Sequence, residues 1–344
     1  MSGFPGKEGW WRLPPGSKNT VCDVPGVLVG HQTLHEGEIH TGVTAICPHG
    51  GNIYRDKVRA GLAVLNGFGK SAGLLQLAEL GQIETPIILT NTFGVSAGIE
   101  ALVRRAITEN PDIGRKTATV NPVVMECNDG WLNDIQRLSV TEDMVNKALH
   151  TTAEDFAQGA VGAGAGMKTF GFAGGVGSAS RKIICGDGTI FTLGCLVLSN
   201  FGVREDLRIC GEVFEPDREE SRDEDKGSII LVFATDAPLD ARQLGRLCRR
   251  SSAALGRLGS VLGNQSGDIA LAFSTAGTVS HDEKCAVKQL TGFNENDMNA
   301  VFYAAVESAE NAVLNSLWHS SAVLGRNGHK APAFREAYEL LNRV

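Results

Sequence analysis

Two apolar stretches place the tightest limit on how this 344-residue chain can fold. Residues 190–200 and 229–234 are runs of apolar and β-branched side chains without the alternation that a half-exposed strand shows. Such runs are typical of strands that are buried in the core. Two strands this apolar belong in the same core, so the sequence predicts a single α/β unit with no domain boundary between them.

The second apolar stretch begins directly after Gly227 and Ser228. Before them, residues 212–226 contain eight acidic and three basic side chains, a charge run that is typical of a solvated loop. Ser228 is therefore expected at the point where a loop enters a buried strand. The simplest interpretation is an ordinary turn before a strand.

A second interpretation gives Ser228 a chemical role. If the bond before it were cut, Ser228 would carry a hydroxyl and a free α-amine, and that amine can accept the hydroxyl proton near neutral pH. Such a nucleophile also needs donors for an oxyanion, polar groups that orient it, and a means of cutting its own peptide bond by an N-to-O acyl shift. Gly227 suits that cleavage because it has no Cβ.

Supporting groups for this nucleophile can be found elsewhere in the sequence. Ser266 and Asp268 are two residues apart at the start of an apolar stretch, which places both side chains on one face of a strand. Asn200 ends the first apolar run and offers an amide donor for an oxyanion. Taken alone, each of these features is also typical of a turn.

Strands and helices are expected to interleave along the chain, after an irregular N-terminal arm at residues 1–19. The glycine clusters at 162–166 and 174–177 lack the order of a dinucleotide-binding fingerprint and favour tight backbone packing around a small-molecule pocket. We expect strands at 27–33, 42–47, 58–65, 85–90, 120–126, 190–200, 228–234 and 268–274, and helices at 71–81, 95–110, 142–158, 239–258 and 298–317.

Composition narrows the function classes. The net charge of −7 argues against nucleic acid as the main partner. Eight scattered cysteines, with no metal-ligand spacing, indicate free thiols in a reducing compartment. The sequence shows neither a signal peptide nor a membrane span, so a cytoplasmic protein is expected. The spacing of the eight histidines fits no zinc pattern, and we expect no metal and no cofactor.

Short motifs in a fixed order run through nearly the whole chain and resemble the self-processing serine aminopeptidases. That family includes L-aminopeptidase/D-amidase/esterases and β-peptidyl aminopeptidases, which are N-terminal-nucleophile-like hydrolases. The combination in this order is specific, whereas each motif alone is not. The matching stretches are Asp23–Val27, Val29–His31, Thr41–Thr44, Asn91–Thr92, Asp129–Asp134, Gly162–Gly164, Gly175–Arg181, Asn200–Gly202, Gly227–Ile230, Thr235–Leu239 and Ser266–Asp268.

The resemblance implies a fold and an assembly. The fold would be a four-layer αββα sandwich in a single domain of residues 1–344, cut between Gly227 and Ser228 into an α-chain of 1–227 and a β-chain of 228–344. These chains typically assemble into a homotetramer. The implied substrates are small peptides and amino acid amides or esters.

The resemblance also implies roles for individual residues. Ser228 would be the nucleophile, Ser266 and Asp268 would support it, and Asn200 would help to form the oxyanion hole. The substrate pocket, where a free amine must be recognised, would include Glu126, Asn128, Asp129 and Asn133.

The chain departs from the family pattern at two places. Cys127 and Asn128 stand where relatives usually have Thr and an aromatic residue, which bears on substrate preference. Ala165 replaces a usual Thr in the glycine-rich block. Two other functions are considered beside the hydrolase: an N-acyltransferase of related fold, whose nucleophile is usually Thr, and an uncleaved binding or regulatory protein with a vestigial site.

Overall fold

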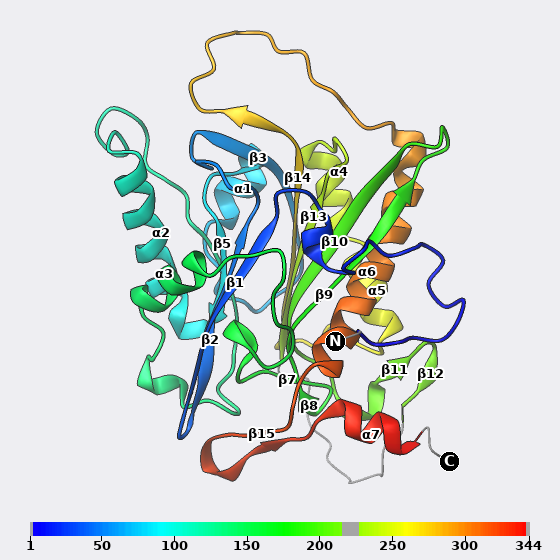
Figure 1. Ribbon diagram of the computed structural model, residues 1–344. Coiled ribbons are helices and arrows are strands. Elements are labelled where there is room, and N and C mark those ends of the chain that lie inside the picture. The colour runs from blue at the N-terminus through cyan, green and yellow to red at the C-terminus, as the bar shows by residue number, and fades with distance from the viewer. Residues whose placement is uncertain (1–2, 215–226, 342–344) are drawn as a thin grey trace.

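Two β-sheets packed face to face form the centre of the computed structural model, which describes residues 3–214 and 227–341. The larger sheet has the strand order β4-β3-β14-β13-β10-β9, and the smaller has the order β1-β2-β5-β6 (Figure 1). Their strands are β1 Leu28–Glu36, β2 Ile39–Cys47, β3 Asp56–Gly67, β4 Gln82–Ile83, β5 Ile87–Asn91, β6 Val123–Cys127, β9 Gly175–Ile184, β10 Ile190–Asn200, β13 Ser228–Thr235 and β14 Gly267–Ser280.

Helices cover the outer face of each sheet, which completes four layers. Helices α2 and α3 pack on the smaller sheet, and α4 and α6 pack on the larger one, with α5 against α6 (Figure 1). The predicted αββα sandwich is therefore confirmed. The helices are α1 Leu74–Leu80, α2 Val95–Glu109, α3 Glu142–His150, α4 Ala241–Cys248, α5 Ser251–Arg257, α6 Met298–Trp318 and α7 Phe334–Leu341.

Three short hairpins complete the described fold. They pair β7 Lys168–Thr169 with β8 Phe172–Ala173, β11 Arg208–Ile209 with β12 Glu212–Val213, and β15 Val323–Leu324 with β16 Lys330–Ala331. The predicted acidic loop at 212–226 begins with β12, and its residues 215–226 lie outside the described part of the chain.

Separate apolar clusters fill the three spaces between the four layers. The cluster between the sheets contains Leu89 and Met125 from the smaller sheet and Ile230 and Phe273 from the larger one, all fully buried or nearly so. Each buried apolar side chain of this kind contributes about 1.5–3 kcal/mol relative to exposure. The alternate side chains of β13, such as Leu231 and Phe233, face the helices instead. The unbroken apolar run of β13 therefore follows from burial on both of its faces.

Two helix predictions are wrong in their extent. Helix α3 ends at His150 rather than at residue 158, because Ala153 exchanges two backbone hydrogen bonds of 3.0 Å with Val29 on β1. The predicted helix 239–258 is two helices that are separated at Arg249 and Arg250. The break lets α4 pack on β3 and β14 while α5 packs against α6.

The second glycine cluster forms the start of strand β9, and its predicted tight backbone packing is confirmed. At Gly177, an added Cβ would lie 2.0 Å from the carbonyl oxygen of Ala312 on α6. Only glycine allows the backbones of β9 and α6 to approach this closely. The glycine-rich sequence thus serves the packing of a helix on the edge of the larger sheet.

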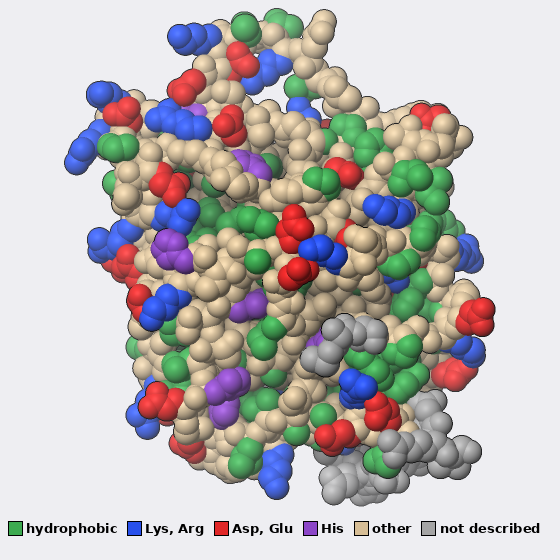
Figure 2. Space-filling model, in the orientation of Figure 1, with side chains coloured by type: hydrophobic (Ala, Val, Ile, Leu, Met, Phe, Trp, Pro, Cys, Tyr) green, Lys and Arg blue, Asp and Glu red, His purple; other side chains and the backbone are tan. Residues whose placement is uncertain are grey.

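The surface carries mixed charge. Figure 2 shows acidic and basic side chains interspersed over one face of the molecule. Within residues 3–214 and 227–341, no helix has both the length and the apolar composition of a membrane span.

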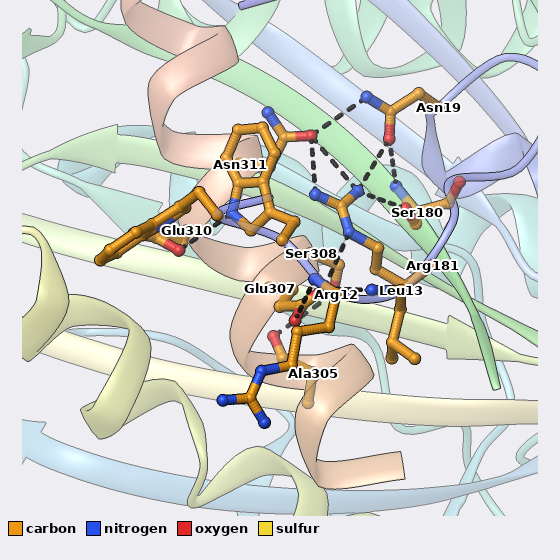
Figure 3. A network of polar contacts seen from close by, with 12 residues as sticks. Arg12, Leu13, Asn19, Ser180, Arg181, Ala305, Glu307, Ser308, Glu310 and Asn311 are labelled. Carbon is orange, nitrogen blue, oxygen red and sulfur yellow. Dashed lines mark hydrogen bonds and ion pairs between the residues drawn. The ribbon is translucent and has the colours of Figure 1, made fainter. Parts of the chain in front are cut away.

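A buried ionic network ties the N-terminal arm to α6 (Figure 3). The guanidinium of Arg181 lies 3.4 Å from the carboxylate of Glu307, and both side chains are almost fully buried. Glu307 also accepts hydrogen bonds from the backbone N–H groups of Arg12 and Leu13, at 2.9 and 3.1 Å. Burial lowers the pKa of Arg181 to about 10, which still leaves it charged near neutral pH. The N-terminal arm is therefore bound to Glu307, whose buried charge is balanced by the buried charge of Arg181.

Replacing Arg181 by Met is expected to lower the free energy of unfolding by about 3–5 kcal/mol, because the buried carboxylate of Glu307 then lacks its counter-ion. Urea or thermal unfolding of the purified protein measures this change. The matched control is Arg104→Met, which removes an exposed ion pair with Glu100 and is expected to cost less than about 1 kcal/mol. Equal losses in the two variants would contradict the role of the network.

Candidate active site

Ser228 is the first residue of β13 and lies between two neighbouring strands. In the ladders it is opposite Asn200 on β10 and Gly267 on β14. Its side chain is buried, with 5% of the residue exposed. The Ser228 hydroxyl donates a hydrogen bond of 2.7 Å to the carbonyl oxygen of Gly227 and accepts one of 3.1 Å from the Gly267 N–H. The hydroxyl thus lies against the carbonyl group that an acyl shift would attack.

The segment around Gly267 also contains the predicted supporting pair. Ser266 donates a hydrogen bond of 2.6 Å to the carboxylate of Asp268, and both residues are about 1% exposed. The side-chain amide of Asn66, at the end of β3, donates to the carbonyl oxygens of Gly263 and Ser266. This loop is therefore fixed in place where it enters β14, and the Gly267 N–H joins it to Ser228.

Asn200 lies beside Ser228 on β10, on the side away from Gly267. Its side-chain carbonyl accepts a hydrogen bond of 2.9 Å from the Lys168 N–H, and its amide nitrogen donates one of 3.0 Å to the carbonyl oxygen of Asn128. An amide nitrogen carries two hydrogens, and the bond to Asn128 uses one of them. Held in this way, the Asn200 amide has a fixed orientation beside Ser228.

Gly227 occupies a space in which no side chain fits. A Cβ added there would lie 2.1 Å from the Asn200 carbonyl oxygen and 2.5 Å from the Phe201 Cα. The glycine before Ser228 is thus required by the close approach of two backbones.

Glu126 reaches the same region from the smaller sheet. It lies in β6 and is 3% exposed. Its two carboxylate oxygens accept hydrogen bonds from the Lys70 N–H, at 2.7 Å, and from the Thr92 hydroxyl. A Cβ added at Gly69 would lie 3.6 Å from the Glu126 carboxylate and 3.9 Å from the Gly267 Cα. A carboxylate from the smaller sheet is therefore close to the segment that contacts Ser228.

Asp129 and Asn133 form a buried network that braces the loop after β6. Asp129 is fully buried and accepts hydrogen bonds from Thr41 at 2.6 Å, from Asn133 at 2.9 Å and from Asn91 at 3.2 Å. Desolvation raises the pKa of Asp129 to about 6. Asn133 accepts a hydrogen bond from the His40 N–H. Both side chains are committed to internal contacts, and their predicted part in substrate binding stays a prediction.

The side chain of Asn128 differs from this pair because it is exposed. Its carbonyl group accepts a hydrogen bond of 2.9 Å from the Gly130 N–H, which stabilises its own turn. The backbone of Asn128 contacts Asn200, so this residue affects the site chiefly through its main chain.

The thiol of Cys127 lies close to the site but does not compete as a nucleophile. It is fully buried and lies 3.5 Å from the Leu198 carbonyl oxygen. Burial raises the pKa of Cys127 well above its ordinary value, so the thiol stays protonated near neutral pH. Within the described ranges, no three His, Cys, Asp or Glu side chains lie close enough together to hold a metal ion.

The structure brings Asn200, Ser228, Ser266 and Asp268 together at one end of the adjacent strands β10, β13 and β14. Glu126 of the smaller sheet lies close to the same segment. Sequence reasoning missed Lys70, Thr92 and Asn66, which hold Glu126 and the Ser266 loop in position. The Asn91–Thr92 motif could have identified Thr92 as a residue of the site. Lys70 acts through its backbone, and no side-chain pattern identifies such a contact.

The fold and the proteins that resemble this chain define its class. The protein is a serine peptide hydrolase with the N-terminal-nucleophile hydrolase fold. The chain belongs to peptidase family S58, whose family model matches residues 19–331. The self-processing serine aminopeptidase resemblance is thereby confirmed. These findings favour a hydrolase over an N-acyltransferase and over a binding protein.

Relatives of known activity share most of their length with this chain. The β-peptidyl aminopeptidase BapA of Sphingosinicella xenopeptidilytica is 36% identical over 342 residues, covering 92% of this chain and 84% of that protein. The BapA protein of Sphingosinicella microcystinivorans is also 36% identical, with 92% and 85% coverage.

Solved structures share the fold. The PH0078 protein of Pyrococcus horikoshii superposes with a TM-score of 0.93 and 46% identity over 98% of this chain and 96% of that one. The L-aminopeptidase D-Ala-esterase/amidase of Ochrobactrum anthropi, described as a prototype for the serine aminopeptidases, gives a TM-score of 0.87 and 37% identity, with 96% of both chains covered.

Proposed function

We propose that this serine aminopeptidase cuts its own Gly227–Ser228 bond and then uses Ser228 as an N-terminal nucleophile. Residues 1–227 become an α-chain and residues 228–344 a β-chain within the same fold. The Ser228 hydroxyl attacks the carbonyl carbon of Gly227, the C–N bond breaks, and water hydrolyses the resulting ester. The new α-amine of Ser228 is then the general base for hydrolysis of substrates.

The observation that carries this proposal is the position of the Ser228 hydroxyl. It is hydrogen-bonded to the carbonyl of Gly227 and lies between Asn200 on one strand and the Ser266–Asp268 segment on the other. In the catalytic cycle, Asn200 donates to the oxyanion while Ser266 and Asp268 orient Ser228. The leaving amine takes the proton, and water releases the acyl group from Ser228.

Glu126 supplies the recognition of a free amine. Its buried carboxylate is fixed by Lys70 and Thr92, and a charge so placed binds a substrate ammonium group through charge-assisted hydrogen bonds. We therefore propose that the Glu126 carboxylate binds the N-terminal amine of peptides and of amino acid amides or esters. The β-peptidyl aminopeptidase and L-aminopeptidase relatives support these substrate classes.

We also propose a homotetramer of αβ units in the cytoplasm, the assembly and location that were expected from the sequence. All eight cysteines are free, seven of them buried or half-buried, which suits a reducing compartment. Gel filtration and light scattering of the purified protein test the assembly.

The function is tested with wild-type protein on a denaturing gel and with a matched set of substrates. We expect two bands of about two-thirds and one-third of the 36.5 kDa mass, the smaller one beginning at Ser228. Amino acid p-nitroanilides should be cleaved and their N-acetylated counterparts should not, because acetylation removes the ammonium group that Glu126 binds. A single band after long incubation, with no hydrolysis, would overturn the proposal.

A further inference from the structure

A single peptide group connects the side chain of Asn66 with the proposed nucleophile. The peptide between Ser266 and Gly267 donates its N–H to the Ser228 hydroxyl oxygen at 3.1 Å. The carbonyl oxygen of the same peptide accepts a hydrogen bond of 2.5 Å from the side-chain amide of Asn66. A trans peptide group is planar, and its C=O and N–H point in opposite directions. The bond from Asn66 therefore also fixes the direction of the Gly267 N–H.

Asn66 holds the rest of the turn before β14 as well. Its amide nitrogen donates a hydrogen bond of 2.8 Å to the carbonyl oxygen of Gly263, and the carbonyl oxygen of Asn264 lies 3.5 Å away. The Gly263 oxygen also accepts a bond of 2.9 Å from the Ser266 N–H, which closes the turn. An amide nitrogen carries two hydrogens, and the two shorter bonds use both of them. The turn is thus attached to β3 directly before the segment that contacts the nucleophile.

A β-bulge places Asn66 at this turn. In the ladder between β3 and β14, Asn66 is opposite Asp268 and Val64 is opposite Ile269. One residue of β3, Leu65, is therefore extra at this point. Bulges change the direction in which a side chain points and are common beside active sites. The irregular register thus accompanies a polar side chain that serves the neighbouring strand.

Glycine at position 267 makes an external support for this peptide necessary. A Cβ added there would lie 3.0 Å from the Phe68 carbonyl oxygen and 3.1 Å from the Gly69 Cα, so the space for a side chain is tight. Without a Cβ, the backbone can adopt more conformations, and the preceding peptide could rotate and turn its N–H away from Ser228. The bond from Asn66 opposes this rotation because it would be lost in the rotated state.

We propose that Asn66 is a positioning residue for both reactions of Ser228. By holding the Ser266 carbonyl, it keeps the Gly267 N–H directed at the Ser228 hydroxyl oxygen. This places the hydroxyl against the Gly227 carbonyl during self-cleavage and against the substrate carbonyl afterwards. The same bond polarises the peptide group, which strengthens its N–H as a donor to an oxygen that loses its proton during attack.

This inference rests on the proposed function and is tested with Asn66→Asp, which keeps the shape of the side chain but has no amide hydrogens. We expect the rate of self-cleavage and the kcat per processed chain to fall together by about 10–100-fold. KM should change little, because Glu126 is held by Lys70 and Thr92. Cell-free synthesis followed over time on a denaturing gel gives the first rate. Hydrolysis of one amino acid p-nitroanilide gives kcat and KM.

Three further variants separate positioning from stability. Asn66→Ala removes the amide without adding a charge and should show the same two losses. Asn66→Gln keeps the amide and should be faster than Asn66→Asp in both reactions. Asn121→Ala is the matched control, since the Asn121 amide donates a bond of 2.9 Å to the backbone carbonyl of Gly73, outside the site. It should lower the unfolding midpoint about as much as Asn66→Ala does and leave both rates unchanged.

Three results would overturn the inference while leaving the proposed function intact. They are unchanged rates in Asn66→Asp and Asn66→Ala, a higher KM with an unchanged kcat, and an equal loss of both rates in the Asn121→Ala control. If the wild-type protein neither cuts its chain nor hydrolyses the p-nitroanilide, the proposed function fails instead, and the inference that rests on it fails as well.

Discussion

Replacing Ser228 by Ala is expected to give one uncut chain that has lost about 10⁴-fold or more of its amidase activity. The reason is that a single hydroxyl carries out both steps. Without it, nothing attacks the carbonyl of Gly227, and no acyl group can be transferred from a substrate. A denaturing gel measures the first effect, and hydrolysis of amino acid p-nitroanilides measures the second.

The Ser228→Cys variant is the matched control, since a thiol of similar size retains a nucleophile. We expect it to show slow cleavage of the chain, which Ser228→Ala should not show at all. The unfolding midpoint of each variant checks that the fold is intact, because a buried alanine at the start of β13 removes only the hydrogen bonds with Gly227 and Gly267. Two bands or full hydrolysis with Ser228→Ala would rule out this nucleophile.

Replacing Asn200 by Asp is expected to lower kcat about 10²–10³-fold with little change in KM, the usual effect of removing one oxyanion donor. The two side chains have nearly the same shape. Aspartate keeps the oxygen that accepts the Lys168 N–H but loses the amide hydrogens. Steady-state kinetics on one amide substrate give both constants.

The Asn200→Ala variant separates catalysis from support of the loop. It removes the contacts with both Lys168 and Asn128, so its unfolding midpoint should fall further than that of Asn200→Asp, while kcat falls to a similar extent. If Asn200 were only a turn former at the end of β10, Asn200→Asp would retain most of the wild-type kcat. That outcome would remove Asn200 from the oxyanion hole.

Local patterns predicted most elements of the fold. The apolar runs of β10 and β13 and the long apolar helix α6 were found because burial leaves a periodic or continuous signal in sequence. The extent of α3 was wrong because Ala153 pairs with β1, a contact between residues far apart that no local pattern reports. The glycine cluster of β9 predicted tight backbone packing, but its neighbour, the backbone of α6, could not be predicted for the same reason.

In the candidate site, too, the sequence predicted individual residues but not the contacts between distant segments. The motif order singled out Ser228, Ser266, Asp268 and Asn200, and the ladders of β10, β13 and β14 bring them together. The bonds that hold Glu126 come from the Lys70 backbone and the Thr92 hydroxyl, on segments of the chain remote from it in sequence. The bond from Asn66 to the Ser266 carbonyl joins residues 200 positions apart, and the sequence carries no sign of it.

The sequence by itself determined that Ser228 stands at the start of a buried strand, because the polarity changes abruptly there. It also determined the family, through motifs spread along the chain. Only the tertiary structure decided what surrounds that serine: the register that sets Asn200 and Gly267 on either side of it, and the packing of the smaller sheet that brings up Glu126. Register and sheet packing are sums of many contacts between distant residues, and no single stretch of sequence records them.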